Sequence, residues 1–415
     1  MTKPAAPQAH LNVFWNTARL KRLSWASILG LVLALVISLN LGRDRALLLI
    51  SGDFPGLFVQ AVILERGLQS RLYDPALQAQ IENEFWPEFN GAYYMSVYPP
   101  FIGAFLKPLA NINVASAGFL FRLANLLGML AAVWILGQLK PKGRHLFLPR
   151  FAFLLCCAPV FCGVFGGQNT GFSMLLYAVI VWGLEHNHRR AHKLAAGIGL
   201  GLWFFKPQFG LIALAYAILS GQIWAALNAL GVALGLYLLS ARTMGMDWPI
   251  VWLKALSAFS SENYLANQHQ QISIIGAAQA VVNVLGNQGL VARFAFWLGV
   301  LFTIAVIVKT AQELWRHKGN PRTAPAWLLV GPAICLISPQ TLFYDMGIGL
   351  SACFTLADLH NTKHMTALCI LIVLMAIFTL LRQSFSIPPL FLVNLVVYLS
   401  VYRLLRTAPP KEAIS

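Results

Sequence analysis

The side chains best suited to acid–base chemistry are a small set of aspartates and glutamates. The sequence has 14 Asp and Glu residues against 30 Lys and Arg residues. Asp53 and Asp74 each stand just before a predicted helix, where a carboxylate can cap the helix or remove a proton from a bound hydroxyl group as a general base. Because Asp-Pro is a common helix-start signal, we favour the structural role for Asp74. For Asp53 both roles stay open.

Polar residues also gather in short clusters between apolar stretches. Aromatic rings beside amides are typical of sugar-binding sites, although Trp and Tyr at a membrane boundary are more often interfacial anchors. Asp345 fits a site and internal packing equally well, because a carboxylate near a membrane helix end is costly to bury without partners. The spacing shows no zinc motif and no nucleotide-binding glycine loop. The clusters are Gly166-Gly167-Gln168-Asn169, Lys206-Pro207-Gln208, the run Asn267-Gln268-His269-Gln270-Gln271, and Ser338-Pro339-Gln340-Thr341 with Tyr344-Asp345.

The composition indicates that a membrane-embedded scaffold must position these clusters. Hydrophobic residues make up 58% of the chain and charged residues 11%, whereas an ordinary soluble domain carries roughly 25% charged residues. We therefore predict an all-α polytopic membrane protein, a bundle of about twelve transmembrane helices. The predicted crossings are 23–42, 114–139, 151–166, 170–185, 194–206, 208–221, 222–241, 290–311, 324–338, 343–360, 365–381 and 388–404.

The distribution of basic residues predicts the orientation in the membrane. Loops rich in Lys and Arg stay in the cytoplasm, which places the tails 1–22 and 405–415 there. The same rule explains the net charge of +16 without a nucleic-acid partner. We predict one domain, 23–404, in the inner membrane, and the outer loops 43–96 and 242–275 form the roof of its site. That site would face the periplasm or the cell exterior.

Three segments depart from a simple alternation of spans and loops. The apolar stretches 97–112 and 272–286 are predicted to be re-entrant or interfacial hairpins, since counting them as crossings would place basic loops on opposite sides. The chain must also turn at Lys206-Pro207, because proline removes a backbone donor and clashes with the preceding helical turn. A charged residue at such a break needs protein or water around it.

The outer loop 43–96 is predicted to be structured. Apolar residues from Leu57 to Leu68 recur at helical spacing, which predicts an amphipathic helix lying in the membrane plane. A second short helix should begin at Pro75, the residue after Asp74. The loop would then act as a lid that carries Asp53 at a helix start.

The order of motifs along the chain resembles glycosyltransferase family 87. The resemblance runs from about residue 50 to 350, and the order of the motifs makes it more specific than any single one. It implies a GT-C-type fold. The motifs are Gly52-Asp53-Phe54, Gly67 with Tyr73-Asp74-Pro75, Tyr98-Pro99-Pro100-Phe101 with Pro108-Leu109-Ala110, Gly167-Gln168-Asn169, Gly197 with Lys206-Pro207, and Ser338-Pro339 with Tyr344-Asp345.

The resemblance implies an enzyme that transfers a hexose, by preference mannose, from a polyprenyl-phosphate carrier to an envelope glycolipid or glycan. Asp53 would be the general base, and Lys206 would hold the leaving phosphate, with Arg43, Arg45 and Arg242 as alternatives. The activated lipid would supply the energy, so no cofactor is expected, and whether a metal ion is needed stays open. The residues expected to bind sugar or acceptor are Tyr98, Gln168, Asn169, His269, Tyr344 and Asp345.

Two other functions stay open at this point. A transporter or flippase for lipid-linked sugars should show two related halves and charges in mid-membrane pathways. Here the halves differ, and the acidic residues collect in one outer loop. A non-catalytic assembly subunit that keeps the fold is the other alternative.

Overall fold

The computed structural model describes residues 52–87, 95–139, 146–186, 190–286, 289–317, 325–359 and 361–407, together with Leu20, Arg22, Ser24 and Trp25. These residues form helices joined by turns, and the β-pairing found among them is one isolated antiparallel bridge between Gln271 and Leu342. The predicted all-α class is confirmed for this part of the chain. Most of the predicted crossing 23–42 and most of the predicted tails, 1–22 and 405–415, lie outside the described residues, as do Arg43 and Arg45.

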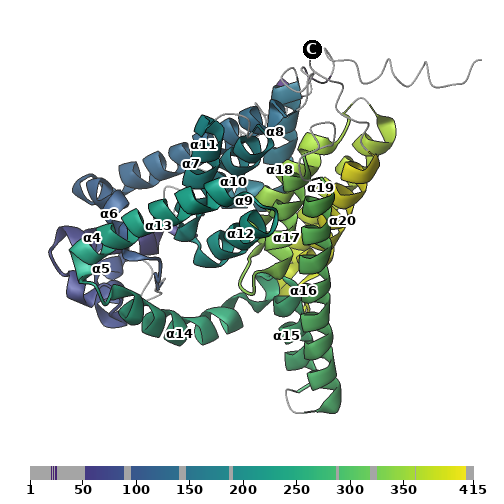
Figure 1. Ribbon diagram of the computed structural model, residues 1–415. Helices are drawn as coiled ribbons and strands as arrows, with labels where there is room; N and C mark the ends of the chain where they lie inside the picture. The colour runs from purple at the N-terminus through teal and green to yellow at the C-terminus, as the bar shows by residue number, and fades with distance from the viewer. Residues whose placement is uncertain are drawn as a thin grey trace, which may run out of the picture.

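The described helices range from one turn to more than seven turns. Figure 1 shows α4, α5 and α6 at one end of the molecule and α16, α19 and α20 at the other, with α14 running between them. The α-helices are α4 (Phe54–Glu65), α5 (Pro75–Phe85), α6 (Pro100–Leu106), α7 (Val114–Gly137), α8 (Phe147–Cys156), α9 (Ala158–Phe165), α10 (Thr170–Glu185), α11 (Arg190–Leu202), α12 (Pro207–Leu219), α13 (Ile223–Met244), α14 (Trp248–Asn267), α15 (Ile274–Val284), α16 (Leu290–Arg316), α17 (Val330–Ile337), α18 (Met346–Leu356), α19 (Thr362–Leu381) and α20 (Pro389–Thr407).

Five of the described helices are long and apolar enough to cross a membrane: α7, α13, α16, α19 and α20. The pair α8 and α9 would add a sixth span, although a bend of 86° separates the two helices. Large apolar side chains on α16 are exposed, among them Phe294, Trp297 and Leu301. Such a surface suits lipid rather than water, and the protein is therefore a membrane protein.

The prediction of about twelve crossings is not supported by the helix lengths. Five predicted spans correspond to α10, α11, α12, α17 and α18, which have 8 to 16 residues, whereas a crossing needs about 20. Every residue of α17 and α18 is buried inside the protein. Hydropathy alone does not separate a helix surrounded by protein from one surrounded by lipid, and this explains the difference.

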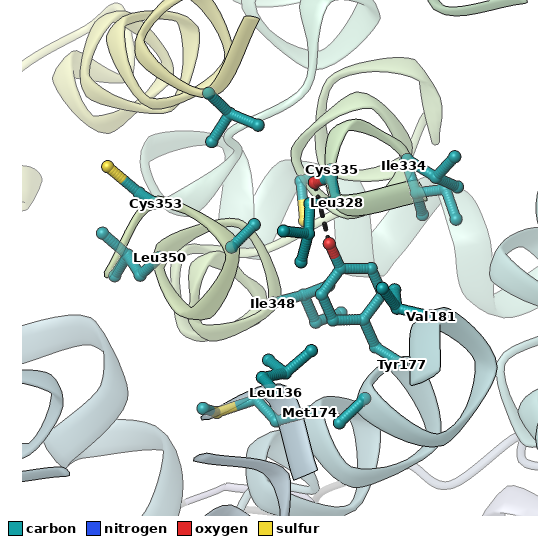
Figure 2. Packing of buried hydrophobic residues seen from close by; sticks show 14 of the residues in the cluster. Leu136, Met174, Tyr177, Val181, Leu328, Ile334, Cys335, Ile348, Leu350 and Cys353 are labelled. Carbon is teal, nitrogen blue, oxygen red and sulfur yellow. Dashed lines mark hydrogen bonds between the residues drawn. The ribbon is translucent and has the colours of Figure 1, made fainter. Parts of the chain in front are cut away.

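The core around α10 shows how these short helices are held. Figure 2 shows the hydroxyl group of Tyr177 donating a hydrogen bond to the carbonyl oxygen of Leu328, at 2.8 Å. The phenol is buried, so this bond satisfies a polar group that would otherwise be left without a partner. The surrounding apolar side chains come from α7, α10, α17 and α18 and include Leu136, Met174, Val181, Ile334, Ile348 and Leu350.

The first outer segment differs from the predicted membrane-surface helix. The helix itself is present as α4, but all of its residues except Glu65 are buried, so it is not amphipathic. Its apolar side chains pack against α5, α6 and α7 in a second hydrophobic cluster. In this cluster the ring centres of Phe54 and Phe121 are 5.3 Å apart. Helix α5 begins at Pro75 as predicted, and the Asp74 side chain caps it by accepting from two backbone N–H groups.

The structure agrees with the predictions for the two interrupted apolar segments and for the helix break at Lys206-Pro207. Segment 97–112 forms α6 and a 3₁₀ turn, and segment 272–286 contains the 11-residue α15, so neither is long enough to span a membrane. The predicted break at Lys206-Pro207 is confirmed, because α12 begins at Pro207 after the short 3₁₀ helix η5 (Trp203–Phe205).

Candidate active site

Asp53 is the residue just before α4, and at this point its segment is in close contact with the loop that contains Gly166 and Gly167. Gly52, the preceding residue, has φ of +97°, a conformation that residues with a side chain rarely adopt. A Cβ atom at Gly52 would lie 2.4 Å from the carbonyl oxygen of Gly166. The backbone N–H of Phe54 donates to the carbonyl oxygen of Gly167 at 3.0 Å. These contacts fix Asp53 against the Gly166-Gly167-Gln168-Asn169 loop.

The carboxylate of Asp53 is held by neutral hydrogen-bond donors. Its Oδ2 atom accepts from the Tyr98 hydroxyl at 2.6 Å and from Asn169 Nδ2 at 2.9 Å. The Gln168 amide, in the orientation that satisfies this network, donates to Oδ2 at 2.7 Å and to Oδ1 at 2.9 Å. The side chain makes no capping bond to α4. Of the two roles open for Asp53, capping is therefore not the one its side chain performs.

Tyr98 is positioned by side chains that bind the backbone of its own segment, residues 96–98. Four donors contact carbonyl oxygens there at 2.8 to 3.2 Å. Two of the donors are buried glutamines of α4 and α5, so the segment is fixed to both helices. These donors are Gln60, Tyr73, Gln78 and Trp252.

The loop that carries Gln168 and Asn169 is fastened to α7 by polar side chains. Asn125 is fully buried, and its amide donates to the carbonyl oxygen of Gln168 and accepts from the backbone N–H of Gly171. One helical turn earlier, Arg122 Nε donates to the carbonyl oxygen of Phe165 at 2.9 Å. Both ends of the loop are therefore held by one helix.

A buried ion pair borders this network. Lys206, at the start of α12, pairs with Asp345 before α18, and their side chains are only 6% and 3% exposed. The Lys206 ammonium also lies 5.3 Å from the centre of the Tyr344 ring. The Tyr344 carbonyl oxygen accepts from Thr170 Oγ1 at 3.2 Å, which connects this pair to the residue after Asn169.

The two groups influence one another electrostatically. Burial raises the pKa of Asp53 above its ordinary value of 3.8, although Lys206 and the Tyr98 hydrogen bond act in the opposite direction and Asp345 adds to the increase. Part of the Asp53 residue remains accessible at the surface. A raised pKa makes this carboxylate a better proton acceptor for a bound hydroxyl group.

Seven of the eight residues predicted for the site lie in these two groups: Asp53, Tyr98, Gln168, Asn169, Lys206, Tyr344 and Asp345. The eighth, His269, is not hydrogen-bonded to them. It lies in the 3₁₀ helix η6 (Gln268–Gln270), where the charge of Arg382 reaches its ring.

Sequence reasoning missed the residues that position the site. Gln60 and Asn125 occur inside largely apolar helices and are fully buried, yet each forms hydrogen bonds to a site segment. A polar residue within an apolar helix was the available signal, because burying an amide without a partner is unfavourable.

Comparison with known families places most of the chain. Residues 97–339 match the family described as Glycosyltransferase family 87. This segment is more than half of the chain and includes Tyr98, Asn169 and Lys206. The chain belongs to glycosyltransferase family 87. Comparisons with curated proteins and with solved structures gave no match.

Membership of glycosyltransferase family 87 makes this protein a membrane glycosyltransferase, as the motif order had indicated. The matched segment begins after Asp53 and ends before Tyr344 and Asp345. Roles for these three residues in the glycosyltransferase therefore depend on the geometry described above.

Proposed function

We propose that the protein is an inverting glycosyltransferase that moves a hexose, by preference mannose, from a polyprenyl-phosphate carrier to an envelope glycolipid or glycan. The observation that carries this proposal is the environment of Asp53. Its carboxylate forms no ion pair within the described residues and is held by three neutral side chains, and the Asp53 residue as a whole is partly exposed. It is therefore oriented for proton transfer without being neutralised by a directly bound cation.

In the proposed reaction, the acceptor hydroxyl group loses its proton to Asp53 as its oxygen attacks the anomeric carbon. The bond between that carbon and the phosphate oxygen breaks on the opposite face, and the electron pair leaves with the phosphate. Inversion at the anomeric carbon follows from this single displacement. One carboxylate suffices, because the phosphate leaves without being protonated.

The surrounding residues have separate roles in this proposal. Gln168, Asn169 and Tyr98 orient the carboxylate, and the same side chains would bind hydroxyl groups of the sugar and the acceptor. Lys206 contributes N–H donors, while Asp345 forms an ion pair with it. The ring of Tyr344 lies against Lys206 and provides a flat surface for a sugar.

The proposal places the site at the outer surface of the inner membrane. The basic loops of the sequence support this orientation. A lipid carrier supports it as well, since its sugar emerges at the membrane boundary and needs no soluble nucleotide donor. No cofactor is assigned to the reaction.

The test is transfer of labelled mannose from polyprenyl-phosphate mannose to an envelope lipid extract by the purified protein in lipid nanodiscs. Asp53→Asn should lower the rate by about 10²–10⁴-fold, with donor binding retained. Asp74→Asn is the matched control, because it removes a carboxylate from the same segment and an asparagine still caps α5. Full activity in Asp53→Asn would rule out the proposed base, and transport of the donor without a new glycosidic bond would rule out the reaction.

A further inference from the structure

Lys206, the cation that lowers the pKa of Asp53, is already paired with Asp345. Lys206 and Asp345 form an enclosed ion pair with almost no exposed surface. Such a pair supplies little net positive charge to a leaving phosphate, whose negative charge grows as the sugar departs. A second positive group near these residues is therefore needed for the proposed reaction.

Arg382 is the candidate for this second positive group, because it lies against the ring of Phe343 and has a buried N–H donor without a partner. It opens the 3₁₀ helix η9 (Arg382–Ser384) after α19, and its guanidinium carbon lies 5.1 Å from the centre of the Phe343 ring. The Phe343 ring is in turn 5.6 Å from the ring of Tyr344, which borders Lys206. Two aromatic rings, those of Phe343 and Tyr344, thus lie between Arg382 and Lys206.

The hydrogen bonds of Arg382 leave one edge of its guanidinium available. Nη1 donates to the carbonyl oxygen of Thr379, and no carboxylate pairs with Arg382 among the described residues. Its Nε atom is buried and has no hydrogen-bond partner. Nε and Nη2 form the edge of a guanidinium that can contact two oxygen atoms of one phosphate.

His269 offers a second donor beside this edge. Helix η6, which carries His269, packs against η9, and Gln268 Nε2 donates to the carbonyl oxygen of Ser386 at 3.3 Å. The Nε2 atom of His269 is also buried without a partner. Burial and the charge of Arg382 lower the pKa of His269, so its ring is neutral at pH 7 and can donate one hydrogen bond. Two unpartnered buried nitrogens on adjacent elements indicate a ligand with several acceptor oxygens.

The surface around Arg382 suits a lipid. Exposed apolar side chains flank it on both sides, and Leu380 is the most exposed of them at 81%. A lipid phosphate could bind here with its phosphate on the charged guanidinium and its apolar chain on the exposed apolar side chains. The other exposed apolar side chains of this surface are Leu381, Phe385 and Ile387.

We propose that Arg382 and His269 bind the phosphate of a lipid-linked substrate, whose apolar chain lies on the exposed residues at the end of α19. This inference rests on the proposed function, because the lipid phosphate it assigns is that of the polyprenyl-phosphate donor. Arg382 provides the charge and two N–H groups on one edge, and His269 provides one further donor. Lys206 then acts on the sugar side of the phosphate.

Binding of polyprenyl phosphate to the full-length protein in nanodiscs made of neutral lipid tests the inference directly. Arg382→Gln should weaken binding by about tenfold or more, and Arg382→Lys should recover part of the affinity because it restores the charge without the planar edge. His269→Gln should weaken binding by about three- to tenfold. Arg293→Gln is the matched control, since Arg293 is an exposed arginine near the start of α16 and this variant should bind within twofold of wild type.

The outcomes separate this inference from the proposed function. Wild-type binding that is unchanged in both Arg382→Gln and His269→Gln overturns the phosphate site and leaves the reaction at Asp53 standing. No binding by the wild-type protein overturns the polyprenyl-phosphate donor itself and the site with it. Equal, Arg382-dependent binding of phosphatidylglycerol would show a general lipid head-group site and would overturn the assignment to the donor. Thermal melting of each variant in the nanodisc reports whether it is folded.

Discussion

The Tyr98 hydroxyl donates a 2.6 Å hydrogen bond to Oδ2 of Asp53, a residue 45 positions earlier in the chain. Asn169 contacts both of them, at 2.9 Å from Asp53 Oδ2 and 2.6 Å from the Tyr98 hydroxyl oxygen. Three segments thus meet in one small triangle of polar atoms. The carboxylate at its centre owes its orientation to the packing of α4, the 96–98 segment and the loop before α10.

Removing the Tyr98 hydroxyl group should shift the pH dependence of sugar transfer to higher pH. The hydrogen bond from Tyr98 favours the charged carboxylate and lowers the pKa of Asp53, so Tyr98→Phe should raise that pKa. The acid limb of the kcat/KM profile should then shift to higher pH, with most activity recovered in alkaline buffer. A purely structural role would reduce activity equally at every pH.

Neutralising Asp345 should have the opposite effect on the same profile. The charge of Asp345 raises the pKa of Asp53, and its loss also leaves the positive charge of Lys206 unopposed. Asp345→Asn should therefore lower the pKa of Asp53 and move the acid limb to lower pH. Breaking a buried ion pair costs about 3–5 kcal/mol, so the profile is measured on protein that has first been shown to be folded. An acid limb that stays in place or moves upward would contradict the proposed coupling.

Adding one methyl group at Gly52 should disturb the site more than the same change at Gly67. Both glycines have positive φ, +97° and +71°, so each alanine costs about 1–2 kcal/mol in backbone energy. Only at Gly52 does the new Cβ collide with a carbonyl oxygen, while nothing lies within 4 Å at Gly67. Gly52→Ala should lower transfer by about tenfold or more, because it separates Asp53 from Asn169. Gly67→Ala should keep near-normal kcat with a lower melting temperature, and equal losses in the two variants would argue against the contact.

Several features of this protein follow from its sequence alone. An apolar composition with few charges determined that the chain is helical and membrane-embedded. Proline and aspartate determined local boundaries, since α5 begins at Asp74-Pro75 and the chain breaks at Lys206-Pro207. The order of motifs indicated the family that the match over residues 97–339 establishes. All of these depend on neighbouring residues or on composition, which a sequence records directly.

Only the tertiary structure decided which groups meet. Asp53 finds its partner Asn169 at a separation of 116 positions, and Lys206 finds Asp345 at 139. Packing also decided that α4 is buried on nearly all sides and that α17 and α18 are surrounded by protein, where hydropathy had suggested a surface helix and two spans. The physical reason is that a residue's apolar or polar character is local, whereas its partners depend on how distant helices pack.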